Sequence, residues 1–233
     1  RRVPAAAAAA LHVGIELVDQ RDRWQASTLA LGLVHKLPDE LPLVPLRSTT
    51  VYPLGVIGVQ IGMPTTLEML SAHPEDGLMV AVVVAPGGPD DPIDLKAIEK
   101  IGVVGRVSDR LNMPGGTVQA TVQGVSRIRL SDVREEAGGY YTAAVAAVRE
   151  KEADEEDARQ SITRILTVLD VLANEVERVS LEVPRILRMN LADPGRFADL
   201  VATLANFSVA TKDEVLQRLD VSDRLHFSLQ ELE

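Results

Sequence analysis

The chain has 233 residues, of which 46% are hydrophobic and 25% are charged, a balance typical of a globular protein with one large or two small domains. Its formal net charge of −10 argues against a nucleic-acid partner, since phosphate contacts need clustered lysine and arginine. The lack of cysteine excludes disulfides, thiolate zinc sites and a cysteine nucleophile, and no run of about 18 apolar residues predicts a membrane span.

Residues 1–40 differ in composition from the rest of the chain. An alanine tract follows Arg1-Arg2-Val3-Pro4, and no clear start or stop signal for a strand or helix is present. We interpret these residues as an extension, either partly disordered or helical. Leu37-Pro38-Asp39-Glu40 has the composition of a linker.

Residues 41–150 are predicted to form a β-rich subdomain. Leu41 to Arg47 is the first strand, and we expect it to be an edge or entry strand because Pro42 and Pro45 lack the backbone donor of a ladder. Leu54 to Ile61 is a second apolar strand.

The next elements are a short helix and a series of strands. Pro64 to Ala72 forms the helix, with proline in its first turn. Leu78 to Ala85 is a continuous apolar run, which indicates a buried central strand. Ile101–Arg110 and Thr117–Leu130 flank a Pro-Gly-Gly turn and predict a hairpin, and Tyr140 to Val148 is the last strand.

Residues 151–233 are predicted to be helical, with the acidic run Glu150–Asp157 marking the boundary. Apolar residues then recur at spacings of three and four, which indicates one long helix from about 158 to 180. These residues are Ile162, Ile165, Leu166, Leu169, Leu172, Val176 and Val179.

Capping patterns predict three further helix starts. Asp193-Pro194 combines an acidic cap with proline in the first turn, Thr211 and Glu214 have capping-box spacing, and Ser222 caps a last helix. That helix has no stop signal before Glu233, so we expect a long helix truncated before another domain. The fold class is therefore α+β.

Motifs that would carry catalysis are missing from the sequence. It contains no G-x-x-x-x-G-K-[ST] phosphate loop, no G-x-S-x-G elbow and no H-E-x-x-H helix. The four histidines, at 12, 35, 73 and 226, lack metal-ligand spacing. Gly102 and Gly105 are interpreted as bulges or tight packing positions of a strand. We predict no catalytic residue, metal or cofactor in this chain.

Two segments, Tyr52–Ile57 and Leu111–Pro114, place large apolar residues near predicted turns. Either core packing or an exposed patch for apolar peptide segments would explain them. Met113 suits such a patch, since its flexible thioether adapts to varied partners. The candidate substrate-binding residues are Tyr52, Pro53, Leu54, Val56, Ile57 and Met113.

Five segments in the same order resemble the amino-terminal domain of Lon, the ATP-dependent protease. They are Leu41–Arg47 with Val51-Tyr52-Pro53, Ile101–Val107 with Pro114–Val118, Val122–Ile128, Asp193–Leu200 and Leu216–Leu225. The resemblance implies a twisted, barrel-like β-subdomain followed by a helical bundle.

The resemblance also implies a function. This chain would engage unfolded, damaged or tagged proteins and help a cytoplasmic homo-hexamer assemble. ATP, magnesium and the serine endopeptidase activity would belong to other domains of the parent protein.

Two alternatives stay open on the sequence. The chain could be a stand-alone adaptor or peptide-binding protein of the same fold, which a stop codon after Glu233 would favour. It could also be an enzyme whose active site follows no recognised motif, although no nucleophile–base pair is visible.

Overall fold

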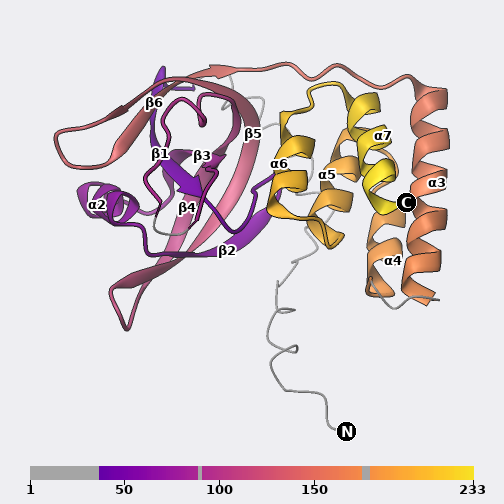
Figure 1. Ribbon diagram of the computed structural model, residues 1–233, viewed down its shortest axis with the longest axis horizontal. Coiled ribbons are helices and arrows are strands. Elements are labelled where there is room, and N and C mark those ends of the chain that lie inside the picture. The colour runs from indigo at the N-terminus through magenta and orange to yellow at the C-terminus, as the bar shows by residue number, and fades with distance from the viewer. Residues whose placement is uncertain (1–36, 89–90, 175–178) are drawn as a thin grey trace, which may run out of the picture.

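The computed structural model describes residues 37–88, 91–174 and 179–233. Its strands and helix α2 occupy one half of the molecule, and helices α3 to α7 occupy the other (Figure 1). The strands are β1 (Glu40–Leu46), β2 (Val56–Ile61), β3 (Leu78–Val84), β4 (Ile101–Met113), β5 (Thr117–Glu135) and β6 (Tyr141–Ala147). The helices are α2 (Pro64–Ala72), α3 (Glu155–Asn174), α4 (Glu182–Arg188), α5 (Pro194–Leu204), α6 (Val209–Gln217) and α7 (Val221–Leu232). The predicted α+β class is confirmed. Most of the predicted extension lies outside the described residues.

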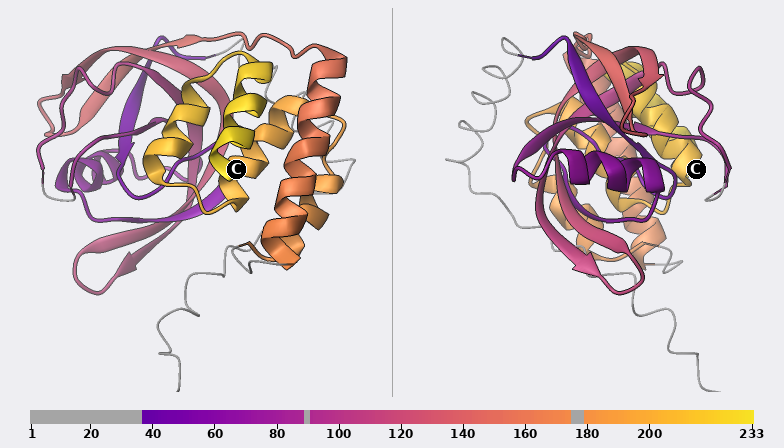
Figure 2. Two further views of the ribbon diagram at one scale, coloured as in Figure 1. Left: turned by 45° about the vertical axis from the view of Figure 1, so that its right-hand side comes forward. Right: turned by 90° about the vertical axis from the view of Figure 1, so that its left-hand side faces the viewer.

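The strands close into a barrel through β5. Their order is β2-β5-β4-β3-β1-β6, and β6 pairs with β5 as well. The first half of β5 pairs with β2, from Val118 to Gln123, and its second half pairs with β6, from Ile128 to Glu135. Strand β2 therefore lies outside the closed ring, while α2 crosses the end of the barrel that is opposite the helical half (Figure 2).

Of the two positions predicted for the first strand, an edge or an entry strand, the edge was wrong. Strand β1 lies between β3 and β6 in the sheet order. Its prolines are tolerated because each half of the strand has one neighbour: Pro42 is in the half that pairs with β6, and Pro45 is in the half that pairs with β3. Each half thus has a free side on which a missing donor breaks no ladder.

The other strand predictions agree with the structure. The predicted central strand is β3, paired on both sides and almost fully buried. The ladder between β4 and β5 shifts register at Gly105. A Cβ atom on Gly102 would lie 2.5 Å from the carbonyl oxygen of Val82. The predicted roles of these glycines, in a bulge and in tight packing, are confirmed.

The helical half has its own core and also shares one with the strands. Ile162, Ile165 and Leu169 of α3 pack into the helical core, as their spacing predicted. Buried residues of α5 and α6, including Ala202 and Leu216, join the cluster formed by one buried face of strands β1 to β5 and by α2. Helices α5 and α6 therefore fix the helical half against the strands. The predicted continuation of α3 to about residue 180 runs through 175–178, outside the described residues.

Helix starts were predicted with mixed success. The side chain of Asp193 accepts a hydrogen bond from the backbone N–H of Arg196, with proline at the first helical position as expected. The caps of α6 and α7 are Ser208 and Asp220 rather than Thr211 and Ser222. In both cases a second capping residue lies two or three positions earlier, and the helix begins at the earlier one.

Candidate functional site

The structure separates the predicted contact residues into buried and exposed ones. Tyr52 is only 4% exposed, and its hydroxyl donates a hydrogen bond to the carbonyl oxygen of Lys212 at 2.6 Å. It anchors the strands to the helices and is not a surface contact, which corrects the expectation for this residue. Pro53, Leu54 and Ile57 are half-buried, and Leu54 has a φ of 61° in the turn that precedes β2.

Val56 and Met113 are exposed, by 47% and 44%, but they do not lie together. Val56 pairs with Gln123 of β5 and Met113 pairs with Thr117, so they occupy one face of the sheet at positions six residues apart along β5. At about 3.3 Å per residue, the two positions lie roughly 20 Å apart along β5. The predicted set is therefore not one continuous patch.

Leu111 is a surface residue that begins the second apolar segment but is not among the predicted contact residues. It is 62% exposed and lies two positions from Met113, so the two side chains share one face of the β4–β5 hairpin. Alternation of Leu111, Asn112 and Met113 before the turn is the signal that could have identified it. Leu111 and Met113 together are called the hairpin patch below, and the hairpin projects beyond the barrel (Figure 1).

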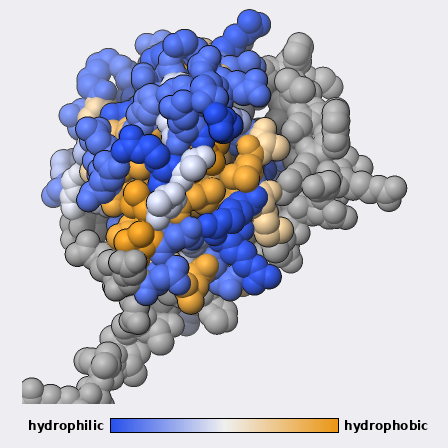
Figure 3. Space-filling model, turned by 90° about the vertical axis from the view of Figure 1, so that its right-hand side faces the viewer, coloured by the Kyte–Doolittle hydropathy of each residue, from blue (hydrophilic) through white to orange (hydrophobic). Residues whose placement is uncertain are grey.

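Apolar side chains also gather on the helical half. Exposed hydrophobic residues there are Val171, Leu181, Met189 and Leu191. Figure 3 shows the molecule from the side of the helical half, with hydrophobic side chains in the middle of this face and hydrophilic side chains around them. The surface of the molecule thus carries apolar residues at both ends.

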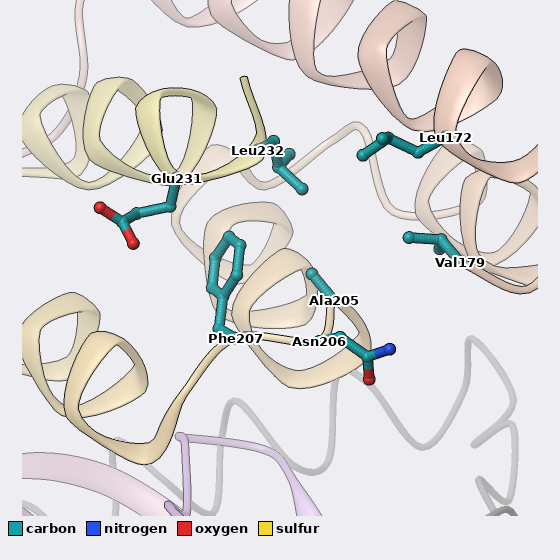
Figure 4. A pocket seen from close by; sticks show the side chains of 7 residues that line it. All are labelled: Leu172, Val179, Ala205, Asn206, Phe207, Glu231 and Leu232. Atoms are coloured by element: carbon teal, nitrogen blue, oxygen red, sulfur yellow. The ribbon is translucent and has the colours of Figure 1, made fainter. Parts of the chain in front are cut away.

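A pocket of about 360 Å³ opens between α3, the loop after α5 and the end of α7. Its lining is Leu172, Val179, Ala205, Asn206, Phe207, Glu231 and Leu232. The side chains of Leu172, Phe207 and Leu232 converge from three different elements (Figure 4). This volume lies at the lower end of ligand sites and can hold one or two apolar side chains.

An ionic cluster joins the strands to the helices, formed by Arg127 of β5, Glu150, Asp199 of α5 and Arg224 of α7. Both guanidiniums bind Asp199: Arg127 Nη2 lies 2.7 Å from Oδ1 and Arg224 Nη1 lies 2.8 Å from the same oxygen. Both also bind Glu150, which is the most exposed member. Two cations and two anions balance each other, so the charges are compensated where water is largely excluded.

The electrostatics of the cluster keep it ionised. Burial alone would raise the pKa of Asp199, but Arg127 and Arg224 outweigh burial and hold that pKa below its usual value. Burial would lower the pKa of Arg127, and Asp199 overcomes this and raises it. The pKa of the neighbouring Tyr52 hydroxyl is raised by burial and by the Asp199 carboxylate. The cluster is therefore a fixed, charged joint between the two halves.

No group of histidines and carboxylates that could hold a metal ion occurs within residues 37–88, 91–174 and 179–233. Over the same ranges, no helix has the length and apolarity needed to cross a membrane. The fold is a strand barrel joined to a helical bundle through the ionic cluster, with apolar residues left on its surface.

Comparison with known families identifies the domain. The family described as the ATP-dependent protease La (LON) substrate-binding domain matches residues 40–233. The chain therefore belongs to the Lon substrate-binding domain family, as its sequence motifs predicted.

Relatives and solved structures agree with this assignment. The chain is 28% identical to the Lon protease of Dictyoglomus thermophilum and 25% identical to that of Escherichia coli K12, over 84% and 83% of its own length. It spans 24% of the length of either relative. The N-terminal domain of a Lon protease from the Mycobacterium avium complex has the same fold, with a TM-score of 0.63 at 20% identity over 83% of this chain and 97% of that one. A Lon N-terminal domain protein from Xanthomonas campestris gives 0.55, also at 20% identity, over 82% and 97%.

Proposed function

We propose that this chain is the substrate-recognition domain of an ATP-dependent, Lon-type serine protease and that it holds apolar segments of unfolded proteins at the hairpin patch. The observation that supports this site is the exposure of Leu111 and Met113 on a projecting hairpin, in a domain whose family is described as substrate-binding. The free energy decreases when another apolar surface covers solvated apolar side chains of this size.

Such a surface sorts proteins by their folding state. A folded protein buries its large apolar side chains, whereas an unfolded or damaged one presents them in series. Each contact is weak, and assembly of the parent into a homo-hexamer would multiply the contacts through effective concentration. In this proposal ATP, magnesium and peptide-bond cleavage belong to the rest of a cytoplasmic parent protein, and this chain supplies recognition.

The hairpin patch can be tested with a double variant, Leu111→Asp with Met113→Asp. Reduced and carboxymethylated lactalbumin, labelled with a fluorophore, serves as the unfolded probe, and anisotropy gives its affinity. We expect binding to weaken about tenfold or more, because two desolvated apolar contacts are replaced by charges. Circular dichroism should stay native, since both side chains are exposed.

A matched control is Val171→Asp with Leu191→Asp, which adds two charges at other exposed apolar residues, 43% and 46% accessible, on the helical half. It should leave the affinity near that of the unsubstituted chain. Equal binding by the hairpin variant and the control would exclude the hairpin patch, and no binding by the unsubstituted chain would refute the function itself.

A further inference from the structure

Strand β2 is an edge strand with a free side. It pairs with β5 from Val56 to Ile61 and lies at one end of the sheet order. Within the part of the chain that the structure describes, no other backbone hydrogen bond reaches residues 56–61. Every second residue of an edge strand directs its N–H and C=O groups away from its partner, so β2 presents a row of unpaired donors and acceptors.

This edge lacks the features that usually block pairing with another chain. Natural edge strands are protected by charged side chains, proline or a bulge. Strand β2 reads Val-Ile-Gly-Val-Gln-Ile, without a charge or a proline, and its register with β5 runs through six consecutive pairs without a shift. It is therefore chemically able to accept one more strand.

The side chains of β2 indicate what kind of strand would fit. Val59 and Ile61 are buried on the inner face, while Val56, Gly58 and Gln60 are exposed on the outer face. On the outer face of β2, Gly58 has no side chain, and neither Val56 nor Gln60 is charged. An added strand would meet uncharged neighbours along its whole length, which favours extended segments rich in β-branched or other apolar residues.

We propose that the free edge of β2 binds an extended client segment as an added β-strand. The proposal rests on the function proposed above and specifies how part of the client is held. Main-chain hydrogen bonds supply affinity in this mode of recognition without demanding one sequence. A folded protein has already paired its backbone groups, so the edge selects unfolded chains on grounds independent of the hairpin patch.

Backbone methylation of a peptide tests the proposal without altering the protein. Three fluorescent peptides share one apolar, β-branched sequence. The first is unmodified. The second is N-methylated at every other residue, which blocks one edge of the extended peptide, and the third is N-methylated so that both edges are blocked. All three keep their side chains, and the second can still pair through its other edge. We expect the first two to bind the 233-residue chain within about twofold, and the third at least tenfold more weakly, because it cannot donate to β2.

The outcomes separate this proposal from the function on which it rests. Equal affinity of all three peptides would show that side chains alone are read and would overturn the added strand while leaving client binding intact. Failure of all three peptides alongside binding of carboxymethylated lactalbumin would overturn it too. Failure of peptides and lactalbumin together would contradict the proposed function.

Disulfide trapping can place the peptide, since the chain has no cysteine of its own. Gln60→Cys puts a thiol on β2, and Gln119→Cys puts one on its cross-strand partner in β5, one strand farther from the free edge. A peptide carrying an activated thiol should form a mixed disulfide readily with the first variant, because neighbouring strands bring Cβ atoms within about 5.5 Å. The second thiol would lie near 10 Å away, so equal trapping of both variants would contradict the location.

Discussion

Arg127 and Asp199 form a two-pronged ion pair, with Nη1 to Oδ2 at 2.9 Å and Nη2 to Oδ1 at 2.7 Å, although 72 positions separate them in the sequence. Their side chains are 1% and 7% exposed. The pair ties the long strand β5 to helix α5, and Arg224 adds α7 to the same carboxylate. One carboxylate therefore positions three elements.

Asp199→Asn should destabilise the protein strongly. The substitution keeps the shape of the side chain and removes its charge, so Glu150 is the one carboxylate of the cluster left for two buried guanidiniums. Removing the charge of one partner in a buried ion pair lowers the free energy of unfolding by about 3–5 kcal/mol. Urea unfolding followed by circular dichroism measures the change in the free energy of unfolding.

Glu156→Gln is the matched control for the loss of one acidic charge. Its ion pair with Arg159 is 57% and 70% exposed, so its urea midpoint should stay close to that of the unsubstituted chain. Similar midpoints for Asp199→Asn and Glu156→Gln would show that the ionic cluster does not stabilise the joint.

Acid should weaken the same joint. The folded pKa of Asp199 lies below its usual value of 3.8, so its contribution to stability is complete above that value and is lost as the pH falls through the folded pKa. We expect the free energy of unfolding to decrease as the pH falls below about 4. The decrease should be shallower in Asp199→Asn, which has no carboxyl group to protonate, and parallel curves for the two proteins would contradict this assignment.

Local patterns were enough to predict most of the fold. The Pro-Gly-Gly hairpin, the apolar run of β3 and the stripe of α3 each follow from residues close in sequence. The position of β1 could not be predicted, because its two halves pair with strands far along the chain. The cluster was missed for the same reason, although an aspartate among the buried residues of α5 was a usable signal.

The candidate contact residues show a different limit. Periodicity distinguishes the two faces of a strand but not what covers each face. Tyr52 was predicted as a contact residue because it is large and lies near a turn, yet the helical half covers it. Leu111, next to the hairpin turn, stays exposed. Only the packing of the two halves separates these cases.

Tyr52→Phe tests the hydrogen bond that holds Tyr52 against the helical half. It removes the hydrogen bond to the Lys212 carbonyl and should lower the free energy of unfolding by about 0.5–1.5 kcal/mol at neutral pH. Because the folded pKa of Tyr52 is raised, its stabilising contribution is complete below the unfolded value of 10.0 and declines as the pH rises above it. Urea midpoints should therefore converge for the two proteins above about pH 10, and a constant gap would argue against the buried, protonated hydroxyl.

Gly124→Ala should disturb the turn that leads into β2. An added Cβ atom would lie 2.1 Å from the carbonyl oxygen of Tyr52, so the turn or β5 must move. The backbone of Gly124 also holds this turn, accepting from the N–H of Leu54 at 3.0 Å and donating to the carbonyl of Gly55 at 2.8 Å. Forced displacement of packed backbone costs about 1–3 kcal/mol, measured as a lower urea midpoint.

Gly195→Ala provides the comparison, since a Cβ atom there would meet nothing closer than 3.4 Å in the first turn of α5. Alanine at this unstrained position should keep or slightly raise stability, because it restricts the unfolded chain more than glycine does. If both alanine variants unfold at the same urea concentration, the close approach of β5 to the Tyr52 turn does not constrain the fold. If Gly124→Ala alone is destabilised, a glycine is required at the point where β5 passes beneath the turn that starts the edge strand.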